Sequence, residues 1–338
     1  MKFRTINPAN EGVVAEYETM PRDEVFAIAR ACNTAFRKWR VLDVLQRATY
    51  FLRLAEVLRK NKEEYARLMT TEMGKPIKES TAEIEKCAWT AEVFADKAED
   101  WLKEEFIEAD GKRHVVFYEP LGVILSIMPW NFPFWQALRF AIPTLLAGNV
   151  SILKHSSNVP QSALAIEEAF REAGFTENAF RAVLADHTTI SELIASDLIH
   201  GVSLTGSVEA GERIAELAGK HLKKVVLELG GSDPFIVLED ADVEAAAKTA
   251  ALARTLNTGQ SCIAAKRFIV VESVAQPFAQ RFAAYLSKLE VGDPMEEKTE
   301  VGPLVNAQAV RDMEEVVQDA LSKGAKVLTG GKRLKRKG

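Results

Sequence analysis

The sequence predicts an α/β protein with a doubly wound parallel sheet and a second α/β unit after it. Three observations predict this class. Between residues 122 and 229, short apolar segments alternate with helical stretches, a spacing typical of parallel strands joined by crossover helices. Polar or glycine-bearing segments follow several of these strands, where ligands bind in such sheets. A new strand–helix alternation begins after Gly230 and Gly231, which indicates the second unit.

The composition is that of a globular chain of about two domains, with 338 residues, 47% hydrophobic and 27% charged. The net charge of −5 comes from mixed signs, so we expect no nucleic-acid partner. No apolar run reaches the roughly 18 residues of a membrane helix, and the N-terminus lacks the apolar centre of a signal peptide. We therefore expect no membrane contact and a cytoplasmic location.

Three helices are expected before the sheet, at about 21–39, 43–73 and 76–102. Cys32 and Cys87 lie among apolar residues at helical spacing, so both are expected in the core. The helices carry no residues suited to chemistry. We interpret them as scaffold.

Residues 106–121 are expected to form a projecting hairpin arm, with its tight turn at Asp110 and Gly111. Such an arm can pair with another subunit or lie on its own domain, and the sequence leaves both open.

The remaining elements follow from the alternation. First-unit strands are expected at 122–128, 150–154, 180–184, 201–205 and 224–229, with helices near 134–146, 160–173, 189–196 and 208–218. Second-unit strands are expected at 234–238 and 267–271, with helices at about 243–256, 275–289 and 307–322.

Cys262 differs from the other two cysteines because it follows a polar, glycine-bearing stretch, residues 257–261, outside any apolar periodicity. A thiol in that setting is placed to react rather than to pack. A cysteine nucleophile needs a donor for the charge it creates and a base to complete the reaction. Asn131, within residues 129–133, and Glu228, within 227–231, offer these groups. Glu228 alone could equally be a strand-end carboxylate bound to neighbouring N–H groups.

Gly206 to Gly211 follow a strand and open a helix, so backbone N–H groups and the helix dipole would face a bound phosphate. The segment lacks the full G-x-G-x-x-G spacing, and alone it fits an ordinary glycine turn as well.

Taken together, residues 129–133 (Pro-Trp-Asn-Phe-Pro), 204–207 (Leu-Thr-Gly-Ser), 227–231 (Leu-Glu-Leu-Gly-Gly) and 257–262 (Asn-Thr-Gly-Gln-Ser-Cys) closely resemble the NAD(P)-dependent aldehyde dehydrogenases. Their order and spacing match along essentially the whole chain. Residues 154–159 and 231–238 are most similar to the succinate-semialdehyde dehydrogenase branch.

The resemblance implies a Rossmann-like dinucleotide-binding domain from residues 1–105 and 122–229, interrupted by the hairpin of residues 106–121, which is a candidate oligomerisation element. It implies a catalytic domain from residues 230–338, which we expect to be incomplete because relatives continue for about another hundred residues or more. A homo-oligomer is expected for the complete family fold.

The resemblance also implies the catalytic roles. The Cys262 thiolate would attack an aldehyde carbonyl, and the Asn131 amide with the N–H of Cys262 would hold the oxyanion. Glu228 would activate the water that releases the acid from a thioester. The substrate would be a small aldehyde, with succinate semialdehyde the first candidate. Arg139 would meet its distal carboxylate, although a helix-surface arginine remains the alternative.

Cofactor residues implied by the resemblance are Trp130, Lys154, Ser157, Gly206, Ser207, Gly211 and Leu229. Ser157 stands where many NAD-using relatives have a glutamate that would repel a 2′-phosphate, so NADP is the expected cofactor and NAD remains possible. The histidines and cysteines lack metal-ligand spacing, so no metal site is expected.

Two functions from different classes follow. The first is an aldehyde dehydrogenase, and the second is an inert nucleotide-binding fragment that keeps the pocket without catalysis. A cysteine hydrolase would need a histidine base, and no histidine has a comparable strand-end context.

Overall fold

The computed structural model describes residues 2–338 and divides the chain into two compact units. The first unit contains residues 2–5, Ala15–Leu68 and Thr81–Leu229. The second contains Ile6–Val14, Met69–Ser80 and Gly230–Gly338. Two short N-terminal segments therefore pack with the C-terminal third of the chain, although they are far from it in sequence.

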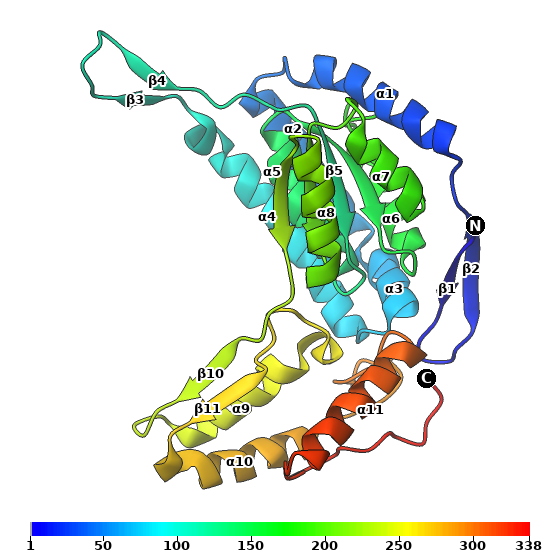
Figure 1. Ribbon diagram of the computed structural model, residues 1–338, viewed down its shortest axis with the longest axis vertical. Helices are drawn as coiled ribbons and strands as arrows, with labels where there is room; N and C mark the ends of the chain where they lie inside the picture. The colour runs from blue at the N-terminus through cyan, green and yellow to red at the C-terminus, as the bar shows by residue number, and fades with distance from the viewer. Residues whose placement is uncertain (1) are drawn as a thin grey trace. The chain divides into compact units, whose positions relative to one another are not determined.

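The first unit is built on a five-stranded parallel sheet with the strand order β7-β6-β5-β8-β9 (Figure 1). Its strands are β5 (Val123–Met128), β6 (Val150–His155), β7 (Phe180–Ala182), β8 (Gly201–Thr205) and β9 (Lys224–Glu228). The order reverses between the adjacent strands β5 and β8, because β6 and β7 lie on one side of β5 and β8 and β9 lie on the other. The predicted doubly wound parallel sheet is confirmed.

Helices cover both faces of this sheet, as right-handed crossovers require. One face carries α5 (Pro133–Leu146) and α6 (Pro160–Glu172), with α2 (Val44–Lys60) packed outside them. The other face carries α1 (Arg22–Trp39), α7 (His187–Ala195) and α8 (Val208–Lys220).

Aromatic rings fill the core between α1, α2 and α6. The ring of Trp39 stacks on Phe175 with centroids 5.4 Å apart, and Phe170 stacks on Phe180 at 4.3 Å. Cys32 is fully buried, and this burial raises the pKa of its thiol to about 12. Cys87 is buried as well, so the prediction that both cysteines pack in the core is confirmed.

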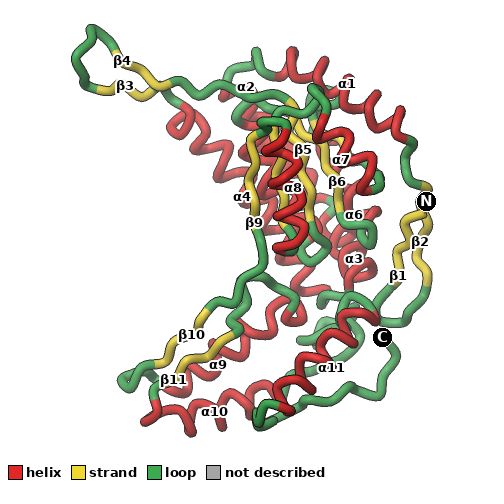
Figure 2. Tube along the Cα trace, viewed as in Figure 1, coloured by secondary structure: helices red, strands yellow, loops and turns green. Residues whose placement is uncertain are grey.

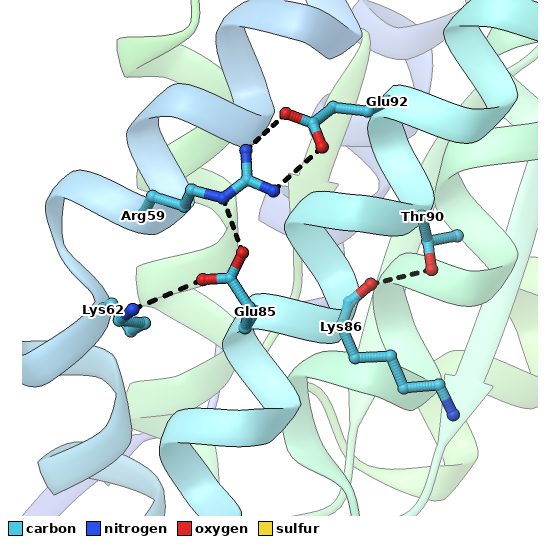
Figure 3. A network of polar contacts seen from close by, with 6 residues as sticks. All are labelled: Arg59, Lys62, Glu85, Lys86, Thr90 and Glu92. Carbon is cyan, nitrogen blue, oxygen red and sulfur yellow. Dashed lines mark hydrogen bonds and ion pairs between the residues drawn. The ribbon is translucent and has the colours of Figure 1, made fainter.

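The single helix predicted over residues 43–73 is wrong, because the chain breaks at Asn61 between α2 and α3 (Lys62–Met73). The Asn61 amide donates to Glu172 at 3.0 Å, a contact 111 residues away that no local pattern reveals. Next to the break, Arg59 donates to Glu85 on α4 (Ile77–Leu102) at 2.6 Å and to Glu92 at 2.8 Å (Figure 3). These hydrogen bonds hold the pKa of both carboxyls below the usual range and tie α2 to α4.

The predicted arm consists of β3 (Glu105–Ile107) and β4 (His114–Val116), which pair antiparallel and project from the body of the first unit (Figure 2). Ile107 pairs with His114, so the connection is six residues long rather than the tight turn expected at Asp110 and Gly111. The Gly111 N–H instead donates to Nε2 of His114 at 2.8 Å. Near the N-terminus, β1 (Lys2–Ile6) and β2 (Val13–Glu18) form a separate two-stranded sheet.

The second unit contains a parallel pair, β10 (Pro234–Val237) and β11 (Arg267–Val270). The helices α9 (Val243–Thr255) and α10 (Glu272–Ser287) pack together, and Val237, Ala247 and Phe278 form part of their core. A 3₁₀ segment, η1 (Leu256–Gly259), follows α9, and α11 (Ala307–Ser322) lies further along the chain. Within residues 2–338, no helix has the length and apolar character needed to cross a membrane.

Candidate active site

The sheet of the first unit gathers the predicted site residues at one edge. Asn131 follows β5, Lys154 is the penultimate residue of β6, Gly206 follows β8, and Glu228 ends β9. The register places Met128 beside His155 and Thr205 beside Glu228. Because parallel strands share the direction of their carboxyl ends, these side chains lie at the ligand-binding edge of the sheet.

The segment that carries Asn131 is held from two sides. The Glu83 carboxylate, buried on α4, accepts the N–H of Trp135 in the first turn of α5 at 2.8 Å. On the other side, Nε2 of His155 donates to the carbonyl of Pro133 at 2.9 Å, while Nδ1 accepts the N–H of Ser156 at 2.9 Å. Burial lowers the pKa of His155 to about 4, so the imidazole is neutral and its tautomer is set by these bonds.

Neither Glu83 nor His155 had a role predicted from the sequence. Both contacts join segments that are distant along the chain. The sequence gives Glu83 only as an acidic residue, a type that is favourable near a helix N-terminus. Its burial and its contact with the start of α5 are visible only in the structure.

Glu228 and Arg139 lie together in the first unit. Nη2 of Arg139 is 3.7 Å from Oε2 of Glu228 and donates to Oγ1 of Thr205 at 3.3 Å. The Glu228 side chain is 61% exposed and that of Arg139 is 31% exposed. The carboxylate is therefore accessible to water and lies beside a guanidinium that is partly enclosed.

Lys154 has the features of an anion-binding residue. It is only 7% exposed, and burial lowers the pKa of its amine. Across residues 2–338 its amine has no hydrogen-bond or ion-pair partner in the structure. An anionic ligand would form a charge-assisted hydrogen bond with this partly enclosed ammonium. Ser157, three positions later, is exposed and uncharged.

His187, the first residue of α7, is a further group at this edge that sequence reasoning missed. The positive charge of Lys154 lowers its pKa most, followed by burial, with Arg213 adding to the effect. Lys154, near the carboxyl end of β6, therefore acts electrostatically on the first residue of α7. His187 could have been suspected from its place just after the neighbouring strand β7.

Gly206 and Gly211 play different structural parts. A Cβ on Gly206 would meet only ordinary contacts, the nearest 3.5 Å away at Leu204, so packing does not require glycine there. A Cβ on Gly211 would lie 2.6 Å from a methyl carbon of Leu229, so a larger residue there would require the Leu229 side chain to move. Between them, Oγ of Ser207 caps α8 by accepting the N–H of Ala210 at 3.2 Å. This arrangement leaves the N-terminus of α8 open to a phosphate.

Cys262 belongs to the second unit and is partly exposed, unlike the buried Cys32 and Cys87. The chain enters it through three consecutive left-handed residues, Asn257 (φ 58°), Thr258 (φ 57°) and Gly259 (φ 74°). This conformation costs about 1–2 kcal/mol for each residue other than glycine, and it is least favourable for β-branched threonine. Asn257 and Thr258 are both buried, so the surrounding structure must maintain it.

Comparison with known proteins identifies the family of this chain. The model of the aldehyde dehydrogenase family matches residues 1–338, the whole chain. The chain belongs to the aldehyde dehydrogenase family.

Several relatives of this aldehyde dehydrogenase support a finer comparison. A Synechocystis protein described as a probable NADP(+) succinate-semialdehyde dehydrogenase is 47% identical over 338 residues, which cover 100% of this chain and 74% of its own. The succinic semialdehyde dehydrogenase of Streptococcus pyogenes, solved in complex with NADP+, is 35% identical with a TM-score of 0.97, and the match covers 99% of this chain and 74% of that one. The succinate-semialdehyde dehydrogenase of Burkholderia pseudomallei matches with 34% identity and a TM-score of 0.95, over 99% of this chain and 70% of that one.

The candidate residues of this aldehyde dehydrogenase are thus distributed over both units. The first unit brings Glu228 and Arg139 together and places Asn131 and the cofactor candidates at the same sheet edge. The second unit carries Cys262 on its left-handed turn. Within residues 2–338 the structure shows no cluster of three or more His, Cys, Asp or Glu side chains suited to a metal ion.

Proposed function

We propose that this chain oxidises a small aldehyde to the carboxylic acid with NADP, through a thioester on Cys262, and that succinate semialdehyde is the first substrate to test. The observation that carries this proposal is the partly exposed Cys262 at the end of a buried, left-handed turn. Strained backbone that the fold maintains beside a reactive side chain is typical of catalytic sites.

In the proposed reaction, each step depends on particular groups of the chain. The sulfur of Cys262 forms a bond to the carbonyl carbon, and the charge that develops on oxygen is held by the Asn131 side-chain amide and the N–H of Cys262. NADP, when bound, accepts the hydride that leaves this carbon. Glu228 then takes a proton from water as the water attacks the thioester, and the carboxylic acid and the Cys262 thiolate are released.

NADP is proposed over NAD for two reasons. Lys154 is only 7% exposed at the carboxyl end of β6, and a 2′-phosphate would form a charge-assisted hydrogen bond with its amine. Ser157, close in sequence, carries no charge that would repel a phosphate. The NADP named for the relatives from Synechocystis and Streptococcus pyogenes supports the same choice.

Arg139 is proposed to bind the distal carboxylate of the substrate. Its guanidinium is partly exposed and already within 3.7 Å of one carboxylate, that of Glu228. Guanidinium groups bind carboxylates in a bidentate manner, which suits the single carboxylate of succinate semialdehyde.

The hairpin of β3 and β4 is proposed to pair with a second copy of the chain. Phe106 on this hairpin is 67% exposed, which is unusual for a large apolar residue unless another surface covers it. A measurement of molecular mass by light scattering, with and without the change Phe106→Glu, tests this pairing.

The catalytic proposal is tested with the purified 338-residue chain. We expect NADPH formation with succinate semialdehyde in the wild type, and none in Cys262→Ser, which still binds NADP. The second candidate function is an inert nucleotide-binding fragment, and it is favoured by one outcome: NADP binds the wild-type chain but no NADPH forms with any member of a small aldehyde panel.

A further inference from the structure

The left-handed turn before Cys262 is maintained by contacts with segments far away in the sequence. Oε2 of Glu79 accepts the N–H of Asn257 at 2.9 Å, across 178 residues. Oγ1 of Thr258 accepts the N–H of Gly302 at 3.1 Å, and Oε1 of Gln260 accepts the N–H of Val305 at 2.9 Å. All of these groups belong to the second unit.

Local contacts fix the two ends of the Cys262 segment. The Arg254 guanidinium donates to the carbonyl of Gly259 at 2.9 Å and to that of Ala265 at 3.3 Å. Nζ of Lys266 donates to the carbonyl of Cys262 at 2.5 Å and to that of Gly231 at 2.9 Å. Side-chain hydrogen bonds therefore hold the backbone before Cys262, at Cys262 and after Cys262.

Glu79 differs from the other holding groups because it acts on the first left-handed residue. It lies in the first turn of α4, and the N–H of Ile77 at the start of that helix donates to the carbonyl of Pro294 at 2.8 Å. Gly302 also approaches the neighbouring segment closely, since a Cβ there would lie 2.1 Å from the carbonyl oxygen of Gly74. Residues 69–80, which include Glu79, are thus in close contact with the chain at Pro294 and Gly302.

We propose that Glu79 is a positioning residue for Cys262: by accepting the N–H of Asn257, its carboxylate selects the left-handed turn that aims the thiol. Glu79 acts through Asn257, and no contact between Glu79 and the sulfur is needed. This inference rests on the proposed role of Cys262 as the nucleophile.

The first test measures acylation of Cys262 by p-nitrophenyl acetate without cofactor, followed by the release of p-nitrophenolate. We expect Glu79→Ala to react about tenfold more slowly, because loss of a charge-assisted hydrogen bond frees the turn to leave its left-handed state. Glu79→Gln keeps an amide oxygen that accepts the same N–H, so we expect a rate within about twofold of wild type.

Asp242→Ala is the matched control. The Asp242 carboxylate also accepts backbone N–H groups in the second unit, from Glu244 at 3.0 Å and Ala245 at 3.1 Å, but it does so at the opposite end of α9. Its removal costs a helix cap and should lower the melting temperature without changing the acylation rate. An equal loss of rate in Asp242→Ala and Glu79→Ala would mean that general loosening explains the effect, and the proposal would be wrong.

Hydrogen exchange of peptides that cover residues 255–262 gives a second measurement that is independent of chemistry. We expect faster exchange in Glu79→Ala than in wild type, and no such change in Glu79→Gln or Asp242→Ala. If wild-type Cys262 does not react with the ester, the proposed function fails. The exchange measurement alone then decides whether Glu79 holds the left-handed turn. Unchanged exchange in Glu79→Ala overturns the inference, as does a Glu79→Gln variant that behaves like Glu79→Ala in either measurement.

Discussion

Arg139 and Glu228 lie together at the carboxyl end of the sheet, with Nη2 of the arginine 3.7 Å from Oε2 of the glutamate. Each has a separate proposed task, the arginine in binding substrate and the glutamate in activating water. Their proximity couples these tasks, because a guanidinium that turns toward a substrate carboxylate leaves Glu228 with less positive charge nearby.

Changing Arg139 separates substrate binding from this coupling. We expect Arg139→Ala to raise KM for succinate semialdehyde about tenfold or more, because a charged hydrogen bond contributes about 1.5–3 kcal/mol. The KM for butanal, which has no distal carboxylate, should stay the same. Steady-state kinetics with both aldehydes provide the measurement. An unchanged KM for succinate semialdehyde would remove Arg139 from the substrate site, and an equal fall of kcat with both aldehydes would assign it to Glu228 instead.

Changing Glu228 should block only the second half of the reaction. Glu228→Gln removes the base but leaves Cys262 and Asn131 in place, so the thioester should form and persist. We expect one rapid equivalent of NADPH per active site, followed by a steady rate lower by about 10²–10⁴. Rapid mixing and mass spectrometry of the acylated protein would detect this. A variant with no burst would show that Glu228 acts before the thioester.

A negative charge at residue 157 should alter cofactor choice. Ser157→Glu would place a carboxylate close in sequence to Lys154, where it repels a 2′-phosphate and can bond to ribose hydroxyls instead. We expect NADP affinity to fall about tenfold or more, equivalent to about 1.4 kcal/mol, with NAD affinity unchanged or higher. Equilibrium titration of both nucleotides provides the measurement, with NAD as the internal control. Retained NADP preference in this variant would mean that residue 157 does not face the phosphate.

The sequence predicted much of the sheet because the signals are local. Apolar strand segments are short and regular, and their alternation with helices alone assigns the polar residues that follow β5, β6, β8 and β9 to one edge. The burial of Cys32 and Cys87 followed from helical periodicity in the same way.

The parts that could not be predicted depend on long-range contacts. The helix break at Asn61 is associated with Glu172, and the association of residues 69–80 with the second unit brings Glu79 to Asn257. Gly259 does signal a turn, but a β-branched residue such as Thr258 argues against left-handed backbone. Contacts distant in sequence, such as that from Gly302, help to hold it there, together with the local hydrogen bond from Arg254 to Gly259.

The stability of the first unit should depend on pH through His155. Its folded pKa of about 4 lies below the ordinary value of 6.5, so the unfolded chain binds the extra proton between these values. The contribution of His155 to the free energy of unfolding is therefore fully present above pH 6.5. It falls as the pH decreases toward 4 and is constant below that. The total loss is on the order of 3 kcal/mol.

Urea unfolding followed by tryptophan fluorescence measures this effect, since all five tryptophans lie in the first unit. His155→Gln has no titrating group, while its amide can still donate to the carbonyl of Pro133. His187 and His200, whose pKa values are also lowered, remain in both proteins, so the difference between the two curves isolates His155. We expect the wild type to lose more stability than the variant between pH 6.5 and 4. Parallel curves would show that His155 binds a proton as readily in the folded protein as in the unfolded chain. Burial would then not lower its pKa, and the hydrogen bond that anchors the Asn131 segment would have to be reassigned.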